Sequence, residues 1–447
     1  MPIRAIFTVL AILLGHGVAS LPTLAVDAAL MQSTPIDLEH GQTATPVTNH
    51  GTLTGIVEDT FCHRVINATV SIGTIGTTTT TDPGGRFFVA FRPSDISADG
   101  VLLVSAAPPG YVENQTKVTL NAGTEYSTTL VLKSIATRTM VMAPNTQPLV
   151  VQEPYHGWVS VPSASIQSTL DAPVSEPVTA QLTTLDPTSE DRRALPGYNF
   201  HGISADDQQT PVTLDVVAAA EINLIGTSGT RYHRLATNAT IRLAVPGELL
   251  GHINDGDNIP LWYYDTSAGL WREEGIGTVQ SAPNNKRPWV EGQVKHITWW
   301  SFAFPIREFA CLRFRPIDAT TNIPLTRLHY WSEGISYLSG AEGILQGDEV
   351  VVVGKKSKDA AHPEQVRLMI YDDEGTPNYL QRDATNQFYK VSMPGLATSI
   401  PLPSTVGTHA PRWENCQDLG LIRIGVRQPG VALGPSPLSA SVAPRAR

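Results

Sequence analysis

Tryptophan is concentrated in one stretch of the chain: five of the eight tryptophans lie between residues 262 and 300. Aromatic side chains combine a large apolar face with a polar edge, so rings exposed side by side could stack on sugar rings and bind carbohydrate. The members of such a platform would be Trp262, Tyr264, Trp271 and Trp289.

The alternative is that these aromatic side chains fill the core of a β domain. Large aromatic residues are mostly buried in folded proteins, and burial is the favoured interpretation for four of them: Trp262, Trp271, Trp299 and Trp300. Successive side chains of a strand point to opposite faces. Trp262 and Tyr264 should therefore share one face of a strand, and Tyr263 should lie on the other.

Two acidic turns offer oxygen ligands for calcium: residues 254–258, with Asp255 and Asp257, and residues 372–375. Calcium takes six or more oxygen ligands, and neither run has the spacing of an EF-hand. Asp, Asn and Gly are also the residues of ordinary turns between strands, which is the favoured interpretation. Calcium is the alternative, and no other cofactor is expected.

The three cysteines, Cys62, Cys311 and Cys416, allow at most one disulfide within a chain. Cys311 and Cys416 bracket one segment near the carboxyl end, so a bridge between them is favoured over a pairing with Cys62. Cys62 would then be free and buried as a small apolar side chain. Three unpaired buried thiols are the alternative.

No pattern of catalytic residues stands out in the chain. It has no His-x-x-Glu or His-Glu-x-x-His pair for zinc, no Gly-x-Ser-x-Gly elbow and no phosphate-binding glycine loop before a helix. The expectation is a protein that is not an enzyme. The net charge of −10 argues against nucleic acid as a partner.

The amino terminus has the order of a secretory signal peptide. Arg4 precedes an apolar run at 5–14, which is followed by the small residues 18–20. The run is too short to span a bilayer, which takes about 20 apolar residues. We therefore expect a signal peptide over 1–28, cleaved after Ser20 or Ala28, a linker over 29–50 and no transmembrane segment in the mature chain. The location would be secreted, periplasmic or at the cell surface.

The composition favours an all-β fold. Charged residues are 16% of the chain, against about 25% in typical proteins, while glycine (36) and proline (34) are frequent. Short apolar runs between turn residues predict three β-sandwich-type domains in tandem, with two packed sheets in an immunoglobulin-like arrangement. The predicted domains span 51–137, 149–305 and 309–427, and a tail without enough apolar residues to fold covers 428–447.

The first predicted domain contains Gly55-Ile-Val-Glu-Asp59 and Thr81-Asp-Pro-Gly-Gly-Arg-Phe87. In the second motif, Pro83 and the two glycines suit a tight turn, after which Phe87 and Val89 should point into the core. The pair of motifs resembles the carboxypeptidase regulatory-like domain, a transthyretin-like sandwich. That resemblance implies an accessory module without catalytic residues of its own.

The third predicted domain shows two similarities to the first. Residues 312–318 resemble the opening strand at 55–59, and Asp383 to Phe388 repeats the spacing of Asp82 to Phe87. We therefore predict a second, diverged transthyretin-like sandwich, with 350–353 as one of its buried strands.

The middle region contains a tryptophan hairpin and a later His-x-Thr-Trp-Trp. The residues of these motifs are Pro260, Trp262, Tyr264, Asp265, Gly269, Trp271, Glu273, Gly275, Gly277, His296, Trp299 and Trp300. Together they resemble a region of cartilage intermediate layer protein and related extracellular proteins. The resemblance implies a non-catalytic extracellular β domain and names no ligand.

Two functions are compatible with these patterns. The first is an exported, non-catalytic β protein that serves binding, adhesion or structure at the cell surface or outside the cell. The alternative is a carbohydrate-binding protein, because starch-binding-like folds and transthyretin-like sandwiches are similar in architecture. The expected partner is accordingly an extracellular protein or a polysaccharide.

Overall fold

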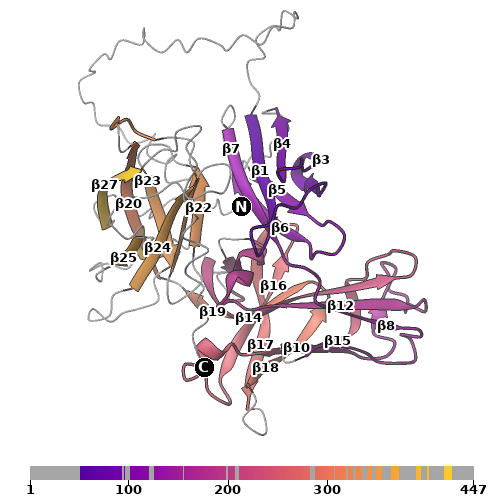
Figure 1. The fold of residues 1–447 in the computed structure, drawn as a ribbon. Helices are drawn as coiled ribbons and strands as arrows, with labels where there is room; N and C mark the ends of the chain where they lie inside the picture. The colour runs from indigo at the N-terminus through magenta and orange to yellow at the C-terminus, as the bar shows by residue number, and fades with distance from the viewer. Residues whose placement is uncertain are drawn as a thin grey trace, which may run out of the picture.

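The computed structural model describes most of the chain between residues 51 and 424 (Figure 1). The described residues are 51–92, 95, 101–119, 125–154, 156–197, 200–206, 211–281, 287–306, 308–318, 321–325, 329–334, 340–344, 349–354, 364–371, 389–393, 400–401 and 417–424. In this part of the chain the regular structure consists of strands and short 3-10 turns, without an α-helix. The prediction of an all-β fold with three sandwich-type units is confirmed.

The first unit packs two sheets against each other. One sheet has the order β4 (Arg86–Phe91), β1 (Gly51–Asp59), β7 (Glu125–Leu132), and the other has the order β3 (Thr77–Thr80), β2 (Thr69–Ile72), β5 (Val101–Ala106), β6 (Asn114–Thr119). Strands β4 and β5 alternate strictly between buried and more exposed residues, as expected for sheets with one face on a core. Phe87 and Val89 are buried, as predicted.

The tight turn before β4 is built by Asp82. Its Oδ1 accepts the backbone N–H groups of Gly84 and Arg86, both at 2.8 Å. Gly85 has φ of +71°, a conformation that glycine adopts without a steric penalty. The Asp-Pro-Gly-Gly motif therefore performs the turn chemistry predicted from the sequence.

The third unit repeats the strand order of the first. Its first sheet places β20 (Glu308–Asp318) between β23 (Glu349–Gly354) and β27 (Gln417–Ile424), with β26 (Ile400–Pro401) also on β20. The second has the order β22 (Gly340–Ile344), β21 (His329–Gly334), β24 (Glu364–Tyr371), β25 (Tyr389–Met393). In both units the opening strand runs parallel to the last strand, β1 to β7 and β20 to β27.

This topology corrects one part of the predicted repeat. The similarity of 312–318 to the opening strand is confirmed, because β20 is the counterpart of β1. The match of Asp383–Phe388 to Asp82–Phe87 is wrong, since the latter leads into β4, whereas residues 383–388 precede β25, the counterpart of β6. Residues 383–388 themselves lie outside the described part. Residues 350–353 do form a strand, within β23.

The turns after the two opening strands close in a similar way, although the turn of the third unit is one residue longer. Asp59 N–H donates to the His63 carbonyl and Asp318 N–H to the Ile323 carbonyl, both at 2.9 Å. The residue before each acceptor is left-handed, Cys62 at φ +64° and Asn322 at φ +60°. Cys62 is exposed and unpaired, so the expectation that its side chain is buried is wrong.

Replacing Cys62 by asparagine, the residue at the matching position of the third unit, is expected to stabilise the protein. Left-handed backbone costs an ordinary side chain about 1 kcal/mol, and asparagine tolerates it better. Urea unfolding measures the gain. Cys62→Ala is the matched control, because it also removes the contact from Arg193 Nη1 to Cys62 Sγ (3.1 Å) but keeps the strain. Equal stability of the two variants would contradict the prediction.

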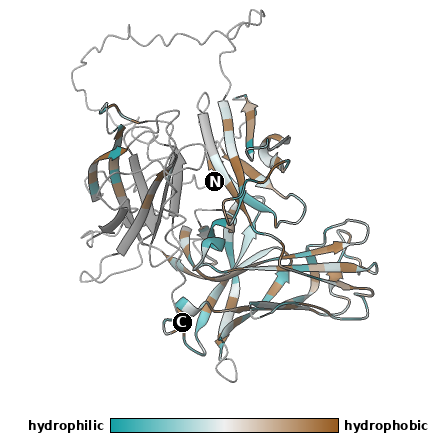
Figure 2. Ribbon diagram, in the orientation of Figure 1, coloured by the Kyte–Doolittle hydropathy of each residue, from teal (hydrophilic) through white to brown (hydrophobic). Residues whose placement is uncertain are grey.

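The middle unit is one sheet of twelve strands that folds over a shared core. The order is β8 (Thr137–Val141), β12 (Val178–Leu185), β14 (Pro211–Gly226), β19 (Trp299–Ile306), β16 (Asn258–Asp265), β17 (Leu270–Gln280), β18 (Trp289–His296), β15 (Arg234–Ala244), β10 (Gly157–Val161), β9 (Leu149–Glu153), with β11 (Ile166–Gln167) on β15 and β13 (His201–Ile203) on β14 and β17. Figure 2 shows hydrophobic and hydrophilic residues interspersed along these strands.

The interior of this middle sandwich holds Trp300 and Phe302 from β19. Phe302 fits because its neighbours on β17 and β18 are glycines: a Cβ on Gly277 would lie 2.2 Å from the Phe302 ring and one on Gly292 would lie 3.0 Å from it. Across the core, Glu153 Oε2 accepts from Thr184 N–H and from its hydroxyl, both at 2.8 Å, which links β9 to β12.

Candidate functional site

Three of the four predicted platform residues are core residues. Trp262, Tyr264 and Trp271 are 0%, 1% and 0% exposed, so they present no ring face to a ligand. The indole N–H groups are satisfied inside the protein: Trp262 Nε1 donates to the Ala303 carbonyl at 2.9 Å and Trp271 Nε1 to the Pro196 carbonyl at 3.1 Å. The platform is wrong for these residues, and core packing, the favoured interpretation, is confirmed.

The tryptophans are divided between two cores on opposite faces of the sheet. Trp300 lies inside the middle sandwich, whereas Trp262, Trp271 and Trp299 lie in a second core on the other face. Trp262 and Tyr264 share this second face, and Tyr263 packs on the first, as strand alternation predicts. Because these tryptophan-bearing strands are buried on both faces, a second layer of structure has to cover the face that points away from the middle sandwich.

That second layer includes the first sandwich. The second core contains Val112 and Val131, which belong to the first unit, beside Leu195 and Phe200 of the middle unit. Trp299 Nε1 donates to the backbone carbonyl of Glu113 at 3.2 Å. The tryptophan-rich stretch therefore forms a joint between two sandwiches, and we call this second core the joint core.

Charged pairs surround the joint core. The 3-10 segment Glu190–Ala194 places Asp191 against Lys133 at 2.5 Å and Arg193 against Glu58. Glu58 is buried and also accepts from Arg64 at 2.7 Å. Partly buried ion pairs are screened less by salt than exposed ones, so these pairs help to fix the contact between the units.

Two glycines allow the first and middle units to pack closely at the joint core. Gly197 has φ of +62°, and a Cβ there would lie 2.8 Å from the Tyr264 ring; its N–H donates to the Gln115 carbonyl at 2.8 Å. Gly269, at φ +63° in the turn between β16 and β17, would place a Cβ 2.5 Å from Leu103 of the first unit. The glycine of the Gly269-Leu-Trp271 motif thus serves packing between units.

A buried carboxyl group lies beside the joint. Glu221 on β14 pairs across the sheet with Trp299 and accepts from Asn223 Nδ2 through Oε1, while its Oε2 has no partner among the described residues. Burial raises the pKa of Glu221 to about 8, and the nearby Glu113 adds to the rise while Arg231 opposes it. Glu221 is therefore protonated at neutral pH.

The outward face of the middle sandwich carries two other tryptophans, Trp158 and Trp289, which lie on either side of Arg242. Arg242 on β15 lies opposite Trp158 of β10 and opposite Glu291 of β18. Its guanidinium carbon is 4.8 Å from the Trp158 ring centre and 5.5 Å from that of Trp289, and it forms an ion pair with Glu291. Both indoles are half-buried. Trp289 is thus the one predicted platform residue that reaches solvent.

Sequence reasoning missed Trp158 and Arg242. The signal was present, because Gly157–Val161 and 239–244 alternate, with Val159, Val161, Ile241 and Leu243 buried and the residues between them directed outward. What the sequence did not show is that β10, β15 and β18 are neighbours, which brings Trp158 and Trp289 together around Arg242.

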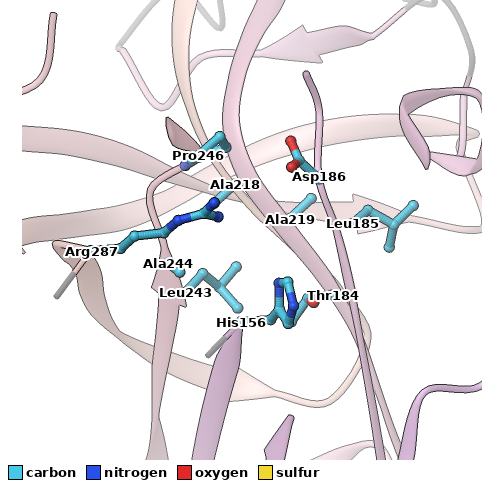
Figure 3. Close-up of a pocket in the computed structure, with 10 residues that line it drawn as sticks. All are labelled: His156, Thr184, Leu185, Asp186, Ala218, Ala219, Leu243, Ala244, Pro246 and Arg287. Carbon is cyan, nitrogen blue, oxygen red and sulfur yellow. The ribbon is translucent and has the colours of Figure 1, made fainter. Parts of the chain in front are cut away.

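A pocket in the middle unit is lined by Ala218 and Ala219 and, among its polar residues, by His156, Asp186 and Arg287 (Figure 3). Asp186 Oδ1 accepts from the Thr188 N–H at 2.9 Å and from its hydroxyl at 2.6 Å. The Asp186 carboxylate therefore already accepts hydrogen bonds from within its own turn.

The acidic turn proposed for calcium uses its carboxylates to bind backbone. Asp257 Oδ2 accepts from Asn254 N–H at 2.7 Å, and Asp255 Oδ1 accepts from Ser281 N–H at 2.5 Å. Among the described residues there is no group of three or more His, Cys, Asp and Glu placed to hold a metal. These contacts are those of an ordinary turn between strands, the favoured interpretation; calcium at this turn stays the untested alternative, and residues 372–375 lie outside the described part.

Several other predictions fall on residues that the structure does not describe. Cys416 and the side chain of Cys311 are among them, so the disulfide stays a prediction. The signal peptide, the linker and the tail also lie outside the described ranges. Within those ranges, no helix is both long and apolar enough to cross a membrane.

Glu176 stabilises the turn that follows β14 through hydrogen bonds. Its carboxylate accepts from Ser228 N–H (2.8 Å), Ser228 Oγ (2.8 Å), Thr227 Oγ1 (2.9 Å) and the Tyr232 hydroxyl. These hydrogen bonds, led by that of Tyr232, lower the pKa of Glu176 to about 2. They favour the charged form of the carboxyl group.

Because this pKa is lowered from 4.5, Glu176 stabilises the fold fully above pH 4.5, and the contribution is lost as the pH falls toward 2. Thermal melts over this range should show the wild type losing its advantage over Glu176→Gln as acid is added. Melting curves that stay the same distance apart at every pH would contradict the assignment.

Comparisons with known proteins add only distant likenesses. No family model and no curated protein matches the chain. Among solved structures, it is similar to the TIE protein of Bacillus anthracis (10% identity, 85% of this chain and 51% of that one, TM-score 0.17). It is also similar to BcpA, the major pilin subunit of Bacillus cereus (12%, 84% and 99%, 0.15), and to the major pilin SpaD of Corynebacterium diphtheriae (9%, 85% and 98%, 0.18). The chain spans about half the length of the TIE protein.

Proposed function

We propose that this chain is an exported, non-catalytic β protein that serves binding, adhesion or structure at the cell surface or in the extracellular space. The observation that carries the proposal is the joint core, in which Trp262, Trp271 and Trp299 hold two sandwiches together. Buried tryptophans contribute large apolar contact areas, and a joint of this kind keeps two modules in one fixed arrangement. A fixed arrangement of modules suits a protein that presents a surface or transmits a load.

The location rests on the amino-terminal sequence. The apolar run at 5–14 after Arg4, and the small residues that follow, support export. The two family resemblances also support an extracellular, non-catalytic protein. The partner in this proposal is an extracellular protein or a polysaccharide.

The test is production of the full chain in a bacterial host, with the amino terminus of the exported protein determined by mass spectrometry. We expect protein in the periplasm or medium that begins after Ser20 or Ala28. Protein that stays in the cytosol with Met1 or its neighbours retained would overturn export. Turnover of peptides or glycans by the purified protein would overturn the non-catalytic role.

A further inference from the structure

We propose that the outward face of β10, β15 and β18 binds an uncharged polysaccharide, with Trp158 and Trp289 as its aromatic anchors. The inference rests on the proposed binding role and names the ligand class for it. We call this surface the Trp158–Trp289 face; its other members are Arg242 and Glu291 and the neutral polar side chains Gln152, Ser160, Thr240, Gln280 and Gln293.

The register of the strands places the anchors on one surface. Trp158 lies opposite Arg242, which lies opposite Glu291. Trp289 is two residues from Glu291 on the same strand and therefore points to the same side. Strands β10 and β18 are separated by β15, so the two indoles stand on strands about 10 Å apart. A short stretch of a sugar chain can reach both rings.

The charges of the face cancel each other. Arg242 forms an ion pair with Glu291, and the positions around the pair carry neutral hydrogen-bonding groups. Gln152 lies opposite Trp158, Trp289 Nε1 donates to Gln280 Oε1 at 3.3 Å, and Gln293 Nε2 donates to Thr240 Oγ1 at 3.0 Å. Amides and hydroxyls beside an apolar ring match the hydroxyls and C–H groups of a neutral sugar.

The net charge of the whole chain also favours an uncharged ligand. The net charge of −10 repels a polyanion over long range, and Arg242 is neutralised by its own partner. The Arg242 guanidinium, which is paired with Glu291, is therefore not a free cation for an acidic polymer. An uncharged polymer meets no such barrier.

The anchors are also held in place before a ligand arrives. The Arg242 guanidinium contacts both rings, which restricts the rotation of each indole, and the strands beneath are fixed by the buried Val159, Ile241 and Val290. A site whose side chains are already ordered loses less entropy on binding. Aromatic rings that are already ordered suit an extended sugar chain.

The test is co-sedimentation of the full exported protein with insoluble starch, cellulose, chitin and xylan. We expect at least one of these polymers to retain the wild type, with Trp158→Ala and Trp289→Ala each weakening retention tenfold or more. Met140→Ala is the matched control, because Met140 is an exposed apolar side chain of β8, outside the face, and this variant should bind like the wild type. Raising the salt concentration should leave retention unchanged.

A second variant covers the case in which a tryptophan variant does not fold. Gln293→Arg changes an exposed side chain and adds a bulky, unpaired charge to the face, and we expect it to weaken retention as well. Retention of none of the polymers, retention that these variants leave intact, or retention only of acidic polymers with loss in salt would each overturn the inference. These outcomes leave the export result untouched, so failure here is distinct from failure of the proposed function.

Discussion

Trp262→Ala is expected to lower the free energy of unfolding by about 3–5 kcal/mol, because truncating a buried tryptophan removes apolar contacts and leaves a cavity. Trp262 is 0% exposed, and its indole N–H donates to the Ala303 carbonyl, which would lose its side-chain donor. Urea unfolding followed by circular dichroism measures the change.

Trp289→Ala is the matched control for this prediction. Trp289 is half-buried and contacts the guanidinium of Arg242, so its loss should cost no more than about 1.5 kcal/mol. Equal effects of the two substitutions would contradict the distinction between a core indole and a surface indole.

Glu221→Gln is expected to stabilise the protein increasingly as the pH rises from 4.5 to 8. The unfolded carboxyl releases its proton near pH 4.5, whereas burial keeps the folded one protonated to about pH 8. Over this interval the unfolded state binds fewer protons, so the stability of the wild type falls with rising pH. Glutamine keeps a neutral group at the same place and does not titrate.

The expected difference between Glu221→Gln and wild type is near zero at pH 4.5 and roughly 2–5 kcal/mol in favour of the variant above pH 8. Urea unfolding at a series of pH values measures it. A difference that does not change with pH would show that Glu221 titrates alike in both states. Arg231 and Glu113, which lie near the group, stay unchanged in both proteins.

Much of the fold could be predicted from local pattern. Strands such as Arg86–Phe91 and Val101–Ala106 alternate because one face meets a core, and alternation is visible in any single segment. The same rule placed Trp262 and Tyr264 together and Tyr263 apart. The Asp82 turn was predictable because its chemistry is complete within a few residues.

What could not be predicted depends on which segments meet. The joint core needs Val112 and Val131 of one sandwich against Trp299 of another, and no local pattern records that contact. Trp158 and Trp289 are far apart in the chain and become neighbours only through β15. The apparent repeat at Asp383 failed for a related reason: an Asp-to-Phe turn occurs before many strands, and spacing alone does not tell which strand follows.

Hydrogen exchange of the full chain, with Trp299→Ala compared with Trp300→Ala, tests the central claim most directly. The two residues are neighbours in sequence, but Trp299 lies in the joint core and donates to Glu113, whereas Trp300 lies inside the middle sandwich. We predict that Trp299→Ala speeds exchange in peptides of the first sandwich around Val112 and Val131 as well as in β19. Trp300→Ala should affect the middle sandwich alone. If Trp299→Ala left exchange in the first sandwich unchanged, the tryptophans would not form a joint between the two units.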